Sequence, residues 1–343
     1  MVVNVVDISF LIPVYNASKY IERTLNSILE VKDVDFEIIC YDDKSLDNSV
    51  EVIKNYVDNT NGKVKLYEGK ENHGVSYARN FLLSKATGKY IWYVDSDDMI
   101  VAECASKFFN VAEKHNVNFV IGGMMKVDEN QDTAIKGNVD EYKILKNQGL
   151  ILDFYDKTAI HSSSSCLYKR NFINEHNIRF DERLCGGEDV MFNYDILLLI
   201  DEMVDYNIVC YNYRYNPNST TKGKTDAQKK RKIERLKSLY IVLHEYLEAG
   251  KFNPPDMCNN EETLRLKIQN TRQNIALVLA SVRDRKYIKE QLKELKQAKI
   301  FPYKRDKSVL KGSENFLKKW LTYMLPIKPF FWIMHLVYKI SGK

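Results

Sequence analysis

The chain has 343 residues, of which 45% are hydrophobic and 28% charged, and its formal net charge is +5. This length suggests about two domains, and the apolar content is sufficient for a core, which excludes a wholly disordered protein. The low counts of proline (7) and glycine (14) exclude a collagen-like chain, and the six cysteines form no CxxC pair, so we expect reduced thiols rather than a disulfide framework or a zinc site.

The first hundred residues alternate between strand and helix signals. Short apolar runs predict buried strands, and apolar residues at helical spacing predict the helices between them. Strands are expected at 7–14, 36–41, 64–67 and 90–94. Ser18 and Asp47 are expected to cap the first two helices, and a third helix is expected over 75–86. Apolar strands that alternate with helices are typical of a parallel sheet covered on both faces, which is an α/β fold.

The next hundred residues are less regular. Helical patterns occupy 106–116 and 188–200, strand patterns occupy 119–122 and 209–215, and two polar segments lie at 128–140 and 162–169, the second becoming strand-like. From Thr221 the composition shifts to charged helical sequence, with a loop at 250–255, a helix at about 262–283 and a lysine-rich helix after it.

Charge is concentrated at the C-terminus. Residues 286–343 carry 14 Lys and Arg against 4 Asp and Glu, whereas the rest of the chain carries 37 against 42. A slightly acidic body with a basic tail indicates an anionic partner for the tail.

The apolar residues of the tail, at about 312–343, help to choose that partner. Trp320 and Trp332 lie there among other aromatic residues and lysines, while two prolines and Lys328 interrupt the stretch. We therefore expect two amphipathic helices in a membrane interface rather than a spanning helix, because no apolar run reaches roughly 20 residues. The alternative is a helix docked on the protein's own core, and the segment is too apolar for a nucleic-acid surface.

Acidic residues follow two of the predicted strands. Asp95, Asp97 and Asp98 end one strand, and Asp42 and Asp43 end another. Parallel sheets bind ligands at the carboxyl ends of their strands, and carboxylates this close repel one another unless a cation such as Mg²⁺ or Mn²⁺ neutralises them. Taken alone, the first group is also compatible with a solvated turn and the second with a helix cap.

Other polar residues stand at helix starts. Arg79 lies on the helix that leads back to the acidic strand, where it can pair with a diphosphate or orient the acidic loop. Glu188 and Asp189 open a helix, a position where acids are also favoured by the helix dipole alone. His161 precedes four serines and suggests hydrogen bonding to an acceptor, although a lone histidine is typical of a structural role.

Four ordered segments resemble the signatures of family-2 glycosyltransferases with the GT-A fold. They read SFLIPVYNASKYIERTLNSIL, DFEIICYDDKSLDNS, ENHGVSYARNFLLSKATGKYIWYVDSDD and FDERLCGGEDVMFN. The resemblance runs from Ser9 to about Thr221 and leaves the C-terminal third uncovered. It implies a Rossmann-like, mainly parallel sheet flanked by helices, with a helical C-terminal extension.

The resemblance also implies the donor site. The residues that would hold the base and ribose of a nucleotide-sugar, expected to be a UDP-sugar, are Pro13, Tyr15 and Asp42 or Asp43. Asp95 and Asp97 match the DxD element, which contacts the ribose and the metal-bridged diphosphate, so both are the expected ligands of Mn²⁺ or Mg²⁺. Arg79 and Arg214 would lie on the donor side, the latter beside a mobile loop at 219–220.

The remaining roles concern the acceptor. Asp189 matches the general base of an inverting enzyme, and Glu188 would orient it, because an acceptor hydroxyl needs a carboxylate to take its proton. Asp98 and His161 would lie on the acceptor side. Two residues depart from the family pattern, since Lys44 and Phe81 stand where glycine is common.

The interpretation divides the chain into a nucleotide-sugar-binding half (1–100), an acceptor-binding half (101–225) and a helical region (226–343). The protein would transfer a hexose or N-acetylhexosamine to a growing, lipid-linked cell-surface glycan at the cytoplasmic face of the membrane. The first ten residues lack a basic n-region, so no secretory signal is expected. Two alternatives remain open, a nucleotidyltransferase and a catalytically silent membrane-associated scaffold with the same fold.

Overall fold

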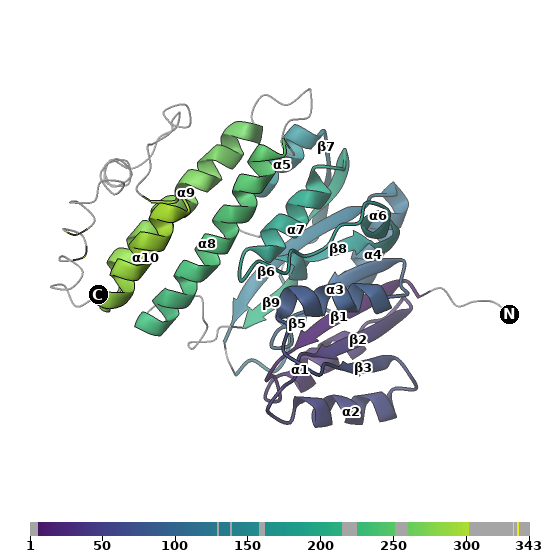
Figure 1. Cartoon of the computed structure of the whole chain (residues 1–343). Coiled ribbons are helices and arrows are strands. Elements are labelled where there is room, and N and C mark those ends of the chain that lie inside the picture. Colours follow the sequence, from purple (N-terminus) through teal and green to yellow (C-terminus); the bar gives the residue numbers. More distant parts are fainter. Residues whose placement is uncertain are drawn as a thin grey trace. The chain divides into compact units, whose positions relative to one another are not determined.

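The computed structural model describes residues 6–128, 130–137, 139–157, 162–214, 225–250, 260–301, 332 and 335. The chain divides into two compact units (Figure 1). Unit 1 comprises residues 1–182 and 188–216, and unit 2 comprises residues 183–187 and 217–343.

Unit 1 is built on a sheet that has nine strands within the described residues. Its order is β3-β2-β1-β4-β8-β6-β9-β5, with β7 also paired to β9. The strands are β1 (Ile8–Val14), β2 (Phe36–Asp42), β3 (Val64–Glu68), β4 (Tyr90–Tyr93), β5 (Met99–Ile100), β6 (Phe119–Val127), β7 (Glu141–Lys146), β8 (Cys166–Lys169) and β9 (Glu202–Arg214). β3, β2, β1 and β4 are mutually parallel, as are β6 and β9, whereas β8, β5 and β7 run antiparallel to their neighbours.

Helices cover this sheet, which confirms the predicted α/β class (Figure 1). They are α1 (Ile21–Leu29), α2 (Ser49–Asn59), α3 (Val75–Lys85), α4 (Glu103–His115), α5 (Gln148–Lys157), α6 (Arg170–Glu175) and α7 (Glu188–Leu197), with the short 3₁₀ helix η1 (Ser163–Ser165). The patterns missed β5, β7, α5 and α6. β5 has two residues and α6 has six, too few for a period, and β7 is mostly exposed and charged.

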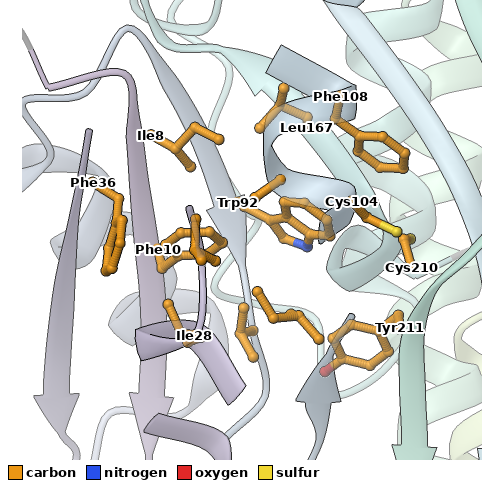
Figure 2. Close-up of a cluster of buried hydrophobic side chains, with 14 of the residues drawn as sticks. Ile8, Phe10, Ile28, Phe36, Trp92, Cys104, Phe108, Leu167, Cys210 and Tyr211 are labelled. Atoms are coloured by element: carbon orange, nitrogen blue, oxygen red, sulfur yellow. The ribbon is translucent and has the colours of Figure 1, made fainter. Parts of the chain in front are cut away.

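The hydrophobic core between the sheet and helices α1, α2 and α4 fixes the strands that carry the acidic residues (Figure 2). The Trp92 ring on β4 stacks on Phe108 of α4 with centroids 5.1 Å apart and lies 5.8 Å from Phe10 of β1. Phe10, Trp92 and Phe108 are completely buried. Burial of these large rings holds the end of β4 in a defined place.

The predicted caps of the first two helices are wrong. α1 begins at Ile21 and α2 at Ser49, and neither Ser18 nor Asp47 is the N-cap residue. Instead, one carboxylate oxygen of Asp47 accepts a hydrogen bond from the Ser18 N–H (2.9 Å), and the other accepts one from the Ser49 N–H (3.0 Å). Asp47 therefore ties the turn after β1 to the start of α2.

Unit 2 contains three long helices in its described part, α8 (Asp226–Glu248), α9 (Asn260–Ala280) and α10 (Arg285–Gln297). α8 starts with a capping box between Thr225 and Gln228, and Asp284 caps α10 by accepting two backbone N–H bonds. Among the helices of the described residues, none is both long and apolar enough to cross a membrane. The loop predicted at 250–255 and the tail at 312–343 lie outside those residues, apart from 250, 332 and 335.

Candidate active site

The carboxyl ends of three neighbouring strands bring the predicted site residues to one edge of the sheet. Val14 at the end of β1 is in register with Asp42 at the end of β2, and Leu11 of β1 is in register with Tyr93 at the end of β4. The turn after β1, the acidic pair after β2 and the acidic loop after β4 therefore lie next to one another, as expected for a parallel sheet.

A pocket of about 340 Å³ opens at this edge. Its lining includes the predicted residues Pro13, Tyr15, Asp43, Asp95 and Asp97, together with Val14, Asn72, Gly74, Val75, Ala78 and Ser96. Two pockets of about 490 Å³ elsewhere on unit 1 contain none of the predicted site residues. The smaller pocket is therefore the candidate donor site, because apolar and acidic groups converge there.

Asp43 organises the wall of this pocket through its hydrogen bonds. Its two carboxylate oxygens accept the N–H groups of His73 (2.8 Å) and Gly74 (2.7 Å), and its carbonyl accepts the Asn72 side-chain amide (3.0 Å). Gly74 has φ +89°, a conformation that favours glycine, directly before α3. Asp43 thus fixes the entry to α3, the helix that carries Arg79.

Asp42 does not line the pocket. It is buried, and one carboxylate oxygen accepts the Ser45 N–H (2.9 Å), while the other has no hydrogen-bond partner among the described residues. Lys44, one of the two departures from the family pattern, adopts φ +62°, which explains why glycine is common there. Phe81, the other departure, packs on the Tyr41 ring with centroids 4.6 Å apart.

The acidic loop after β4 is held by backbone contacts from two sides. The Thr24 hydroxyl of α1 donates to the carbonyl of Asp98 (2.7 Å) and contacts that of Ser96 (3.1 Å), while the Arg214 guanidinium donates to the carbonyl of Asp97 (2.5 Å). Arg214 is buried at the end of β9, where it contacts this loop rather than lining the pocket. The loop is therefore fixed independently of any ligand.

The carboxylates of this loop point in different directions. Asp98 is buried, accepts the Tyr211 hydroxyl (2.8 Å) and the Arg214 N–H (2.7 Å), and does not line the pocket. Asp97 lines the pocket, where burial and the neighbouring charge of Asp95 raise its pKa to about 6. Two neighbouring carboxylates provide the hard oxygen donors and the negative potential that suit a divalent cation.

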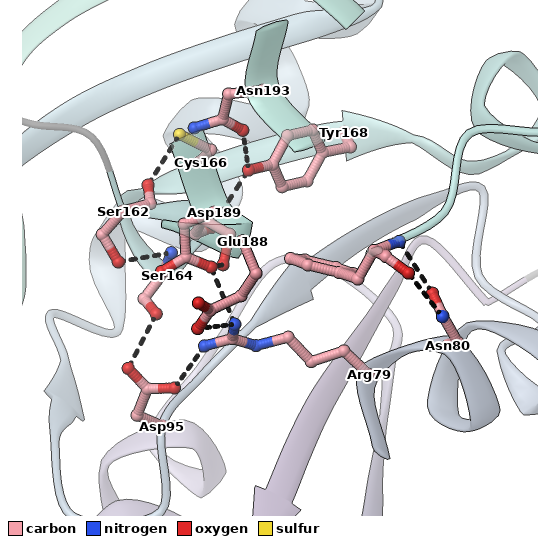
Figure 3. Close-up of polar contacts among 12 residues, drawn as sticks. Arg79, Asn80, Asp95, Ser162, Ser164, Cys166, Tyr168, Glu188, Asp189 and Asn193 are labelled. Atoms are coloured by element: carbon pink, nitrogen blue, oxygen red, sulfur yellow. Dashed lines mark hydrogen bonds and ion pairs between the residues drawn. The ribbon is translucent and has the colours of Figure 1, made fainter. Parts of the chain in front are cut away.

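Arg79 joins the two halves of the predicted site (Figure 3). Its guanidinium, only 3% exposed, contacts Asp95 (3.0 Å), Asp189 (2.8 Å) and Glu188 (3.4 Å). Burial alone would lower the pKa of Arg79, but these three carboxylates raise it above its usual value. It lies over the Phe180 ring at 5.1 Å from the centroid. One cation thus holds together acids that are more than ninety residues apart in the sequence.

Asp189 is the second residue of α7, and the helix begins directly after Gly187, whose φ of +83° favours glycine. Besides Arg79, it accepts the Ser163 hydroxyl (2.7 Å). Burial raises the pKa of Asp189 to about 6, since the opposing effects of Arg79 and Ser163 are offset by the charges of Glu188 and Asp95. A carboxylate with this pKa is mostly ionised at neutral pH and is a stronger base than an ordinary aspartate.

Comparison with known proteins decides the family. The sequence profile of glycosyl transferase family 2 matches residues 9–176, which include the first two acidic groups and Arg79. Residues 9–176 therefore form a glycosyl transferase family 2 domain. The matched segment ends before Asp189, so the profile does not include the second half of the site.

Curated relatives of the family 2 domain are bacterial glycosyltransferases. The chain is 27% identical over 217 residues to glycosyltransferase EpsJ of Bacillus subtilis (strain 168), which covers 62% of each chain. It is 28% identical over 200 residues to the poly(ribitol-phosphate) beta-N-acetylglucosaminyltransferase TarP of Staphylococcus aureus (strain N315), which covers 56% of this chain and 57% of TarP. The chain thus spans less than two thirds of the length of these relatives.

Solved structures share the fold. Staphylococcus aureus TarS in complex with UDP-GlcNAc superposes with a TM-score of 0.57 at 19% identity, covering 80% of this chain and 84% of that one. The mannosyltransferase PcManGT of Pyrobaculum calidifontis, in complex with GDP-Man and Mn²⁺, gives 0.55 at 17% identity, covering 98% and 87%. At these identities the likeness concerns the fold, and it confirms the predicted GT-A architecture.

The sequence analysis misses some residues of the candidate site, and two of its predictions are not placed. Ser163 donates a hydrogen bond to Asp189 and Ser164 donates one to Asp95 (3.2 Å), but in the sequence they stand out only as part of a serine run. His161 and the loop at 219–220 lie outside the described residues. Within the described residues, no group of three or more His, Cys, Asp or Glu side chains is arranged as a metal site.

Proposed function

We propose that the chain is an inverting glycosyltransferase that moves a sugar from a nucleotide-sugar, with a UDP-sugar as the donor, to a hydroxyl group of a glycan chain. Family membership and the pocket at the carboxyl edge of the sheet support transfer from a nucleotide-sugar. The names of TarP and TarS, which are poly(ribitol-phosphate) beta-N-acetylglucosaminyltransferases, make a hexose or N-acetylhexosamine the natural choice of sugar.

The donor would occupy the 340 Å³ pocket along its length. Tyr15 and Asp43, with the apolar Val75 and Ala78, would line the nucleoside part, and Asp95 and Asp97 would lie by the diphosphate. Tyr15 is 50% exposed, so its ring is available to a ligand without further opening of the core. Asp43 already accepts two backbone hydrogen bonds, so it would act chiefly by holding the pocket wall.

A divalent cation, Mn²⁺ or Mg²⁺, fits the acidic half of this pocket. Asp97 would be its main protein ligand because it lines the pocket with a raised pKa, and Asp95 would contribute although Arg79 and Ser164 already contact it. When bound, the cation would neutralise charge that develops on the departing nucleoside diphosphate. With two carboxylates from the protein, its remaining coordination positions would come from the donor and water, as is common for Mg²⁺.

Asp189 would act as the general base. The acceptor hydroxyl loses its proton to the Asp189 carboxylate while its oxygen forms a bond to the anomeric carbon, and the bond from that carbon to the diphosphate oxygen breaks on the opposite face. Arg79 and Ser163 would orient the carboxylate through the contacts described above, and their charge and hydrogen bond keep its pKa from rising further. General-base catalysis of this kind contributes typically 10²–10⁴-fold in rate.

The observation that carries the proposal is the bridging of Asp95 and Asp189 by one buried guanidinium, beside the pocket that Asp97 lines. We expect Asp189→Asn to bind the donor normally but lose at least 100-fold in turnover, and Asp97→Ala to lose metal-dependent donor binding. Asp58→Asn, an exposed change on α2, is the matched control. Released nucleoside diphosphate indicates glycosyl transfer, whereas pyrophosphate would identify a nucleotidyltransferase, and full activity of Asp189→Asn would contradict the assigned base.

The acceptor would be a growing, lipid-linked glycan, and the basic aromatic tail at about 312–343 would bring the enzyme to the membrane surface. We expect truncation after Lys311 to move the protein from the membrane fraction to the soluble fraction. The full-length protein should remain with membranes at low salt without detergent. If it is already soluble under those conditions, peripheral association is wrong, whereas the transfer chemistry is tested separately by the variants above.

A further inference from the structure

Charge separates between the two units of this chain. Unit 1 carries 22 Lys and Arg against 34 Asp and Glu, a balance of −12, whereas unit 2 carries 29 against 12, a balance of +17. The positive charge of unit 2 is therefore not confined to the tail. A unit with this balance attracts anions over distances of about a Debye length.

The positive charge of α10 forms one line. Lys286, Lys289, Lys293 and Lys296 are spaced by three or four residues, so they share one face of the helix, and all four are exposed. We call them the lysine stripe. At 1.5 Å of rise per residue it extends over about 15 Å.

Other side chains of α10 pack or form ion pairs within unit 2. Ile288 and Leu295 are completely buried on the opposite face. Glu294 pairs with Lys237 of α8 (2.9 Å), and Asp284 at the N-cap pairs with Lys230 (2.7 Å). These two acids therefore pair with lysines of α8. Among the described residues, no acidic side chain forms an ion pair with the lysine stripe.

Such a stripe weakens the helix that carries it. Like charges three or four residues apart repel, and cations in the first turn oppose the helix dipole, yet Arg285 and Lys286 occupy that turn. Glu290, one turn from Lys286 and from Lys293, offsets part of this repulsion. Asp284 compensates in part by accepting the N–H groups of Lys286 and Tyr287 (both 3.1 Å). An anionic ligand along the stripe would remove the repulsion.

We propose that the lysine stripe binds the phosphodiester backbone of a linear acceptor polymer. This inference rests on the proposed function, because it assigns the acceptor to the class of polyanionic, phosphate-linked glycans. Lysines placed every 4.5–6 Å along a helix can follow successive phosphates of one extended chain, each contact releasing a counterion.

The shape of the stripe favours a linear chain over a membrane surface. Ile288 and Leu295 of α10 are completely buried and Leu292 is partly buried, so this helix presents no fully exposed aliphatic side chain for insertion into a bilayer. Glu290 is exposed between the turns of the stripe and would oppose a flat anionic surface. A single polymer chain can pass along the lysines without contacting it.

The test uses the full-length protein and a poly(glycerol phosphate) oligomer as the probe. The stripe variant is Lys289→Gln, Lys293→Gln and Lys296→Gln together, because glutamine keeps the helix propensity of lysine. The matched control carries the same changes at three exposed lysines of unit 1, Lys19, Lys32 and Lys126. Affinity is measured between 50 and 200 mM salt, and circular dichroism verifies folding.

We expect the stripe variant to bind the polymer at least tenfold more weakly at low salt, with a slope of log K against log salt flatter by about 2, while the control stays within twofold of the wild type. Equal losses in both variants, or none in either, would overturn the proposal. Loss of binding to anionic lipid vesicles with unchanged polymer binding would also overturn it and identify a membrane site.

Donor turnover separates this inference from the proposed function. The stripe variant should hydrolyse the nucleotide-sugar in the absence of acceptor at the wild-type rate, because none of its changes lies in unit 1. If the polymer binds through the lysine stripe but the protein has no transferase activity, the stripe proposal holds and the proposed function is refuted. If the protein transfers sugar to a polymer and the stripe variant binds that polymer as tightly as the wild type, the proposed function holds and the stripe proposal is refuted.

Discussion

Asp97 gives the sharpest test of the acidic pocket, because its charge should destabilise the metal-free protein. Its pKa is raised from 3.8 to about 6 by burial and by the charge of Asp95. The folded state therefore holds a proton on this carboxyl over a pH range in which the unfolded state has released it. Stability must fall as pH rises from about 4 to 6 and stay lowered above that range.

The size of the effect follows from the same shift. The difference between 3.8 and about 6 corresponds to up to about 3 kcal/mol at pH 8, since one pKa unit is 1.36 kcal/mol. Replacing Asp97 by Asn removes this penalty. In metal-free buffer we expect Asp97→Asn to be more stable than the wild type by up to about 3 kcal/mol at pH 8 and to be equal to it at pH 4. For a unit of about 200 residues this is a rise in Tm of roughly 6–12 °C.

Calorimetry with a chelator at both pH values measures the difference directly. Added Mn²⁺ should then raise the Tm of the wild type and leave that of Asp97→Asn unchanged, because only a ligand that binds the folded state shifts the equilibrium. Asp58→Asn should show neither effect. A gain that is the same at pH 4 and pH 8, or a loss at pH 8, would refute the reasoning that the charge on Asp97 lies in an unfavourable field.

Three further changes test the contacts around the pocket. Arg79→Gln should lower the free energy of unfolding of unit 1 by about 3 kcal/mol, because it leaves Asp95 and Asp189 close together without their cation. A loss below about 1 kcal/mol in urea unfolding would contradict this expectation. Ser163→Ala removes a hydrogen bond that lowers the pKa of Asp189. The acidic limb of the pH profile of kcat should therefore move to higher pH, while the KM for the donor stays unchanged. An unmoved limb would count against Asp189 as the base that Ser163 orients. Lys44→Gly should stabilise by up to about 1 kcal/mol, since it relieves φ +62° at an exposed position, and a destabilised variant would show that the lysine side chain forms a needed contact.

The sequence predicted the parallel half of the sheet better than the rest. β1, β2 and β4 are buried along almost their whole length because both faces of the sheet are covered, so their short, mainly apolar runs identify them within one or two residues. The sequence predicts β9 at 209–215, but the strand runs from Glu202 to Arg214. Its first half contains polar residues that are at least partly exposed, and its pairing with β6 shifts register on both sides of Gly123. Irregular pairing of this kind leaves no period in the sequence.

The candidate site could be predicted only as far as residue types and strand ends allow. Acidic residues follow the strands at Asp43, Asp95 and Asp97, and the topology of a parallel sheet brings the ends of its strands together. These two facts do not predict that the Arg79 guanidinium turns inward to contact Asp189, because that contact depends on the packing of α3 and α7 around Phe180. The direction of Asp98, which faces Tyr211 instead of the pocket, is set by β9 and could not follow from its position after Asp97.

The arrangement of Arg79 explains how a partly buried aspartate can remain a usable base. Burial raises the pKa of Asp189 and so favours its protonated, inactive form, whereas a full ion pair would lower its basicity. Because Arg79 divides its charge among Asp95, Glu188 and Asp189, each carboxylate receives only part of the stabilisation, and the pKa of Asp189 settles at about 6. A cation that neutralises Asp95 on donor binding would leave more of the guanidinium to Asp189. Donor binding should then lower the pKa of the base, and the acidic limb of kcat should lie below that of kcat/KM for the acceptor-saturated enzyme.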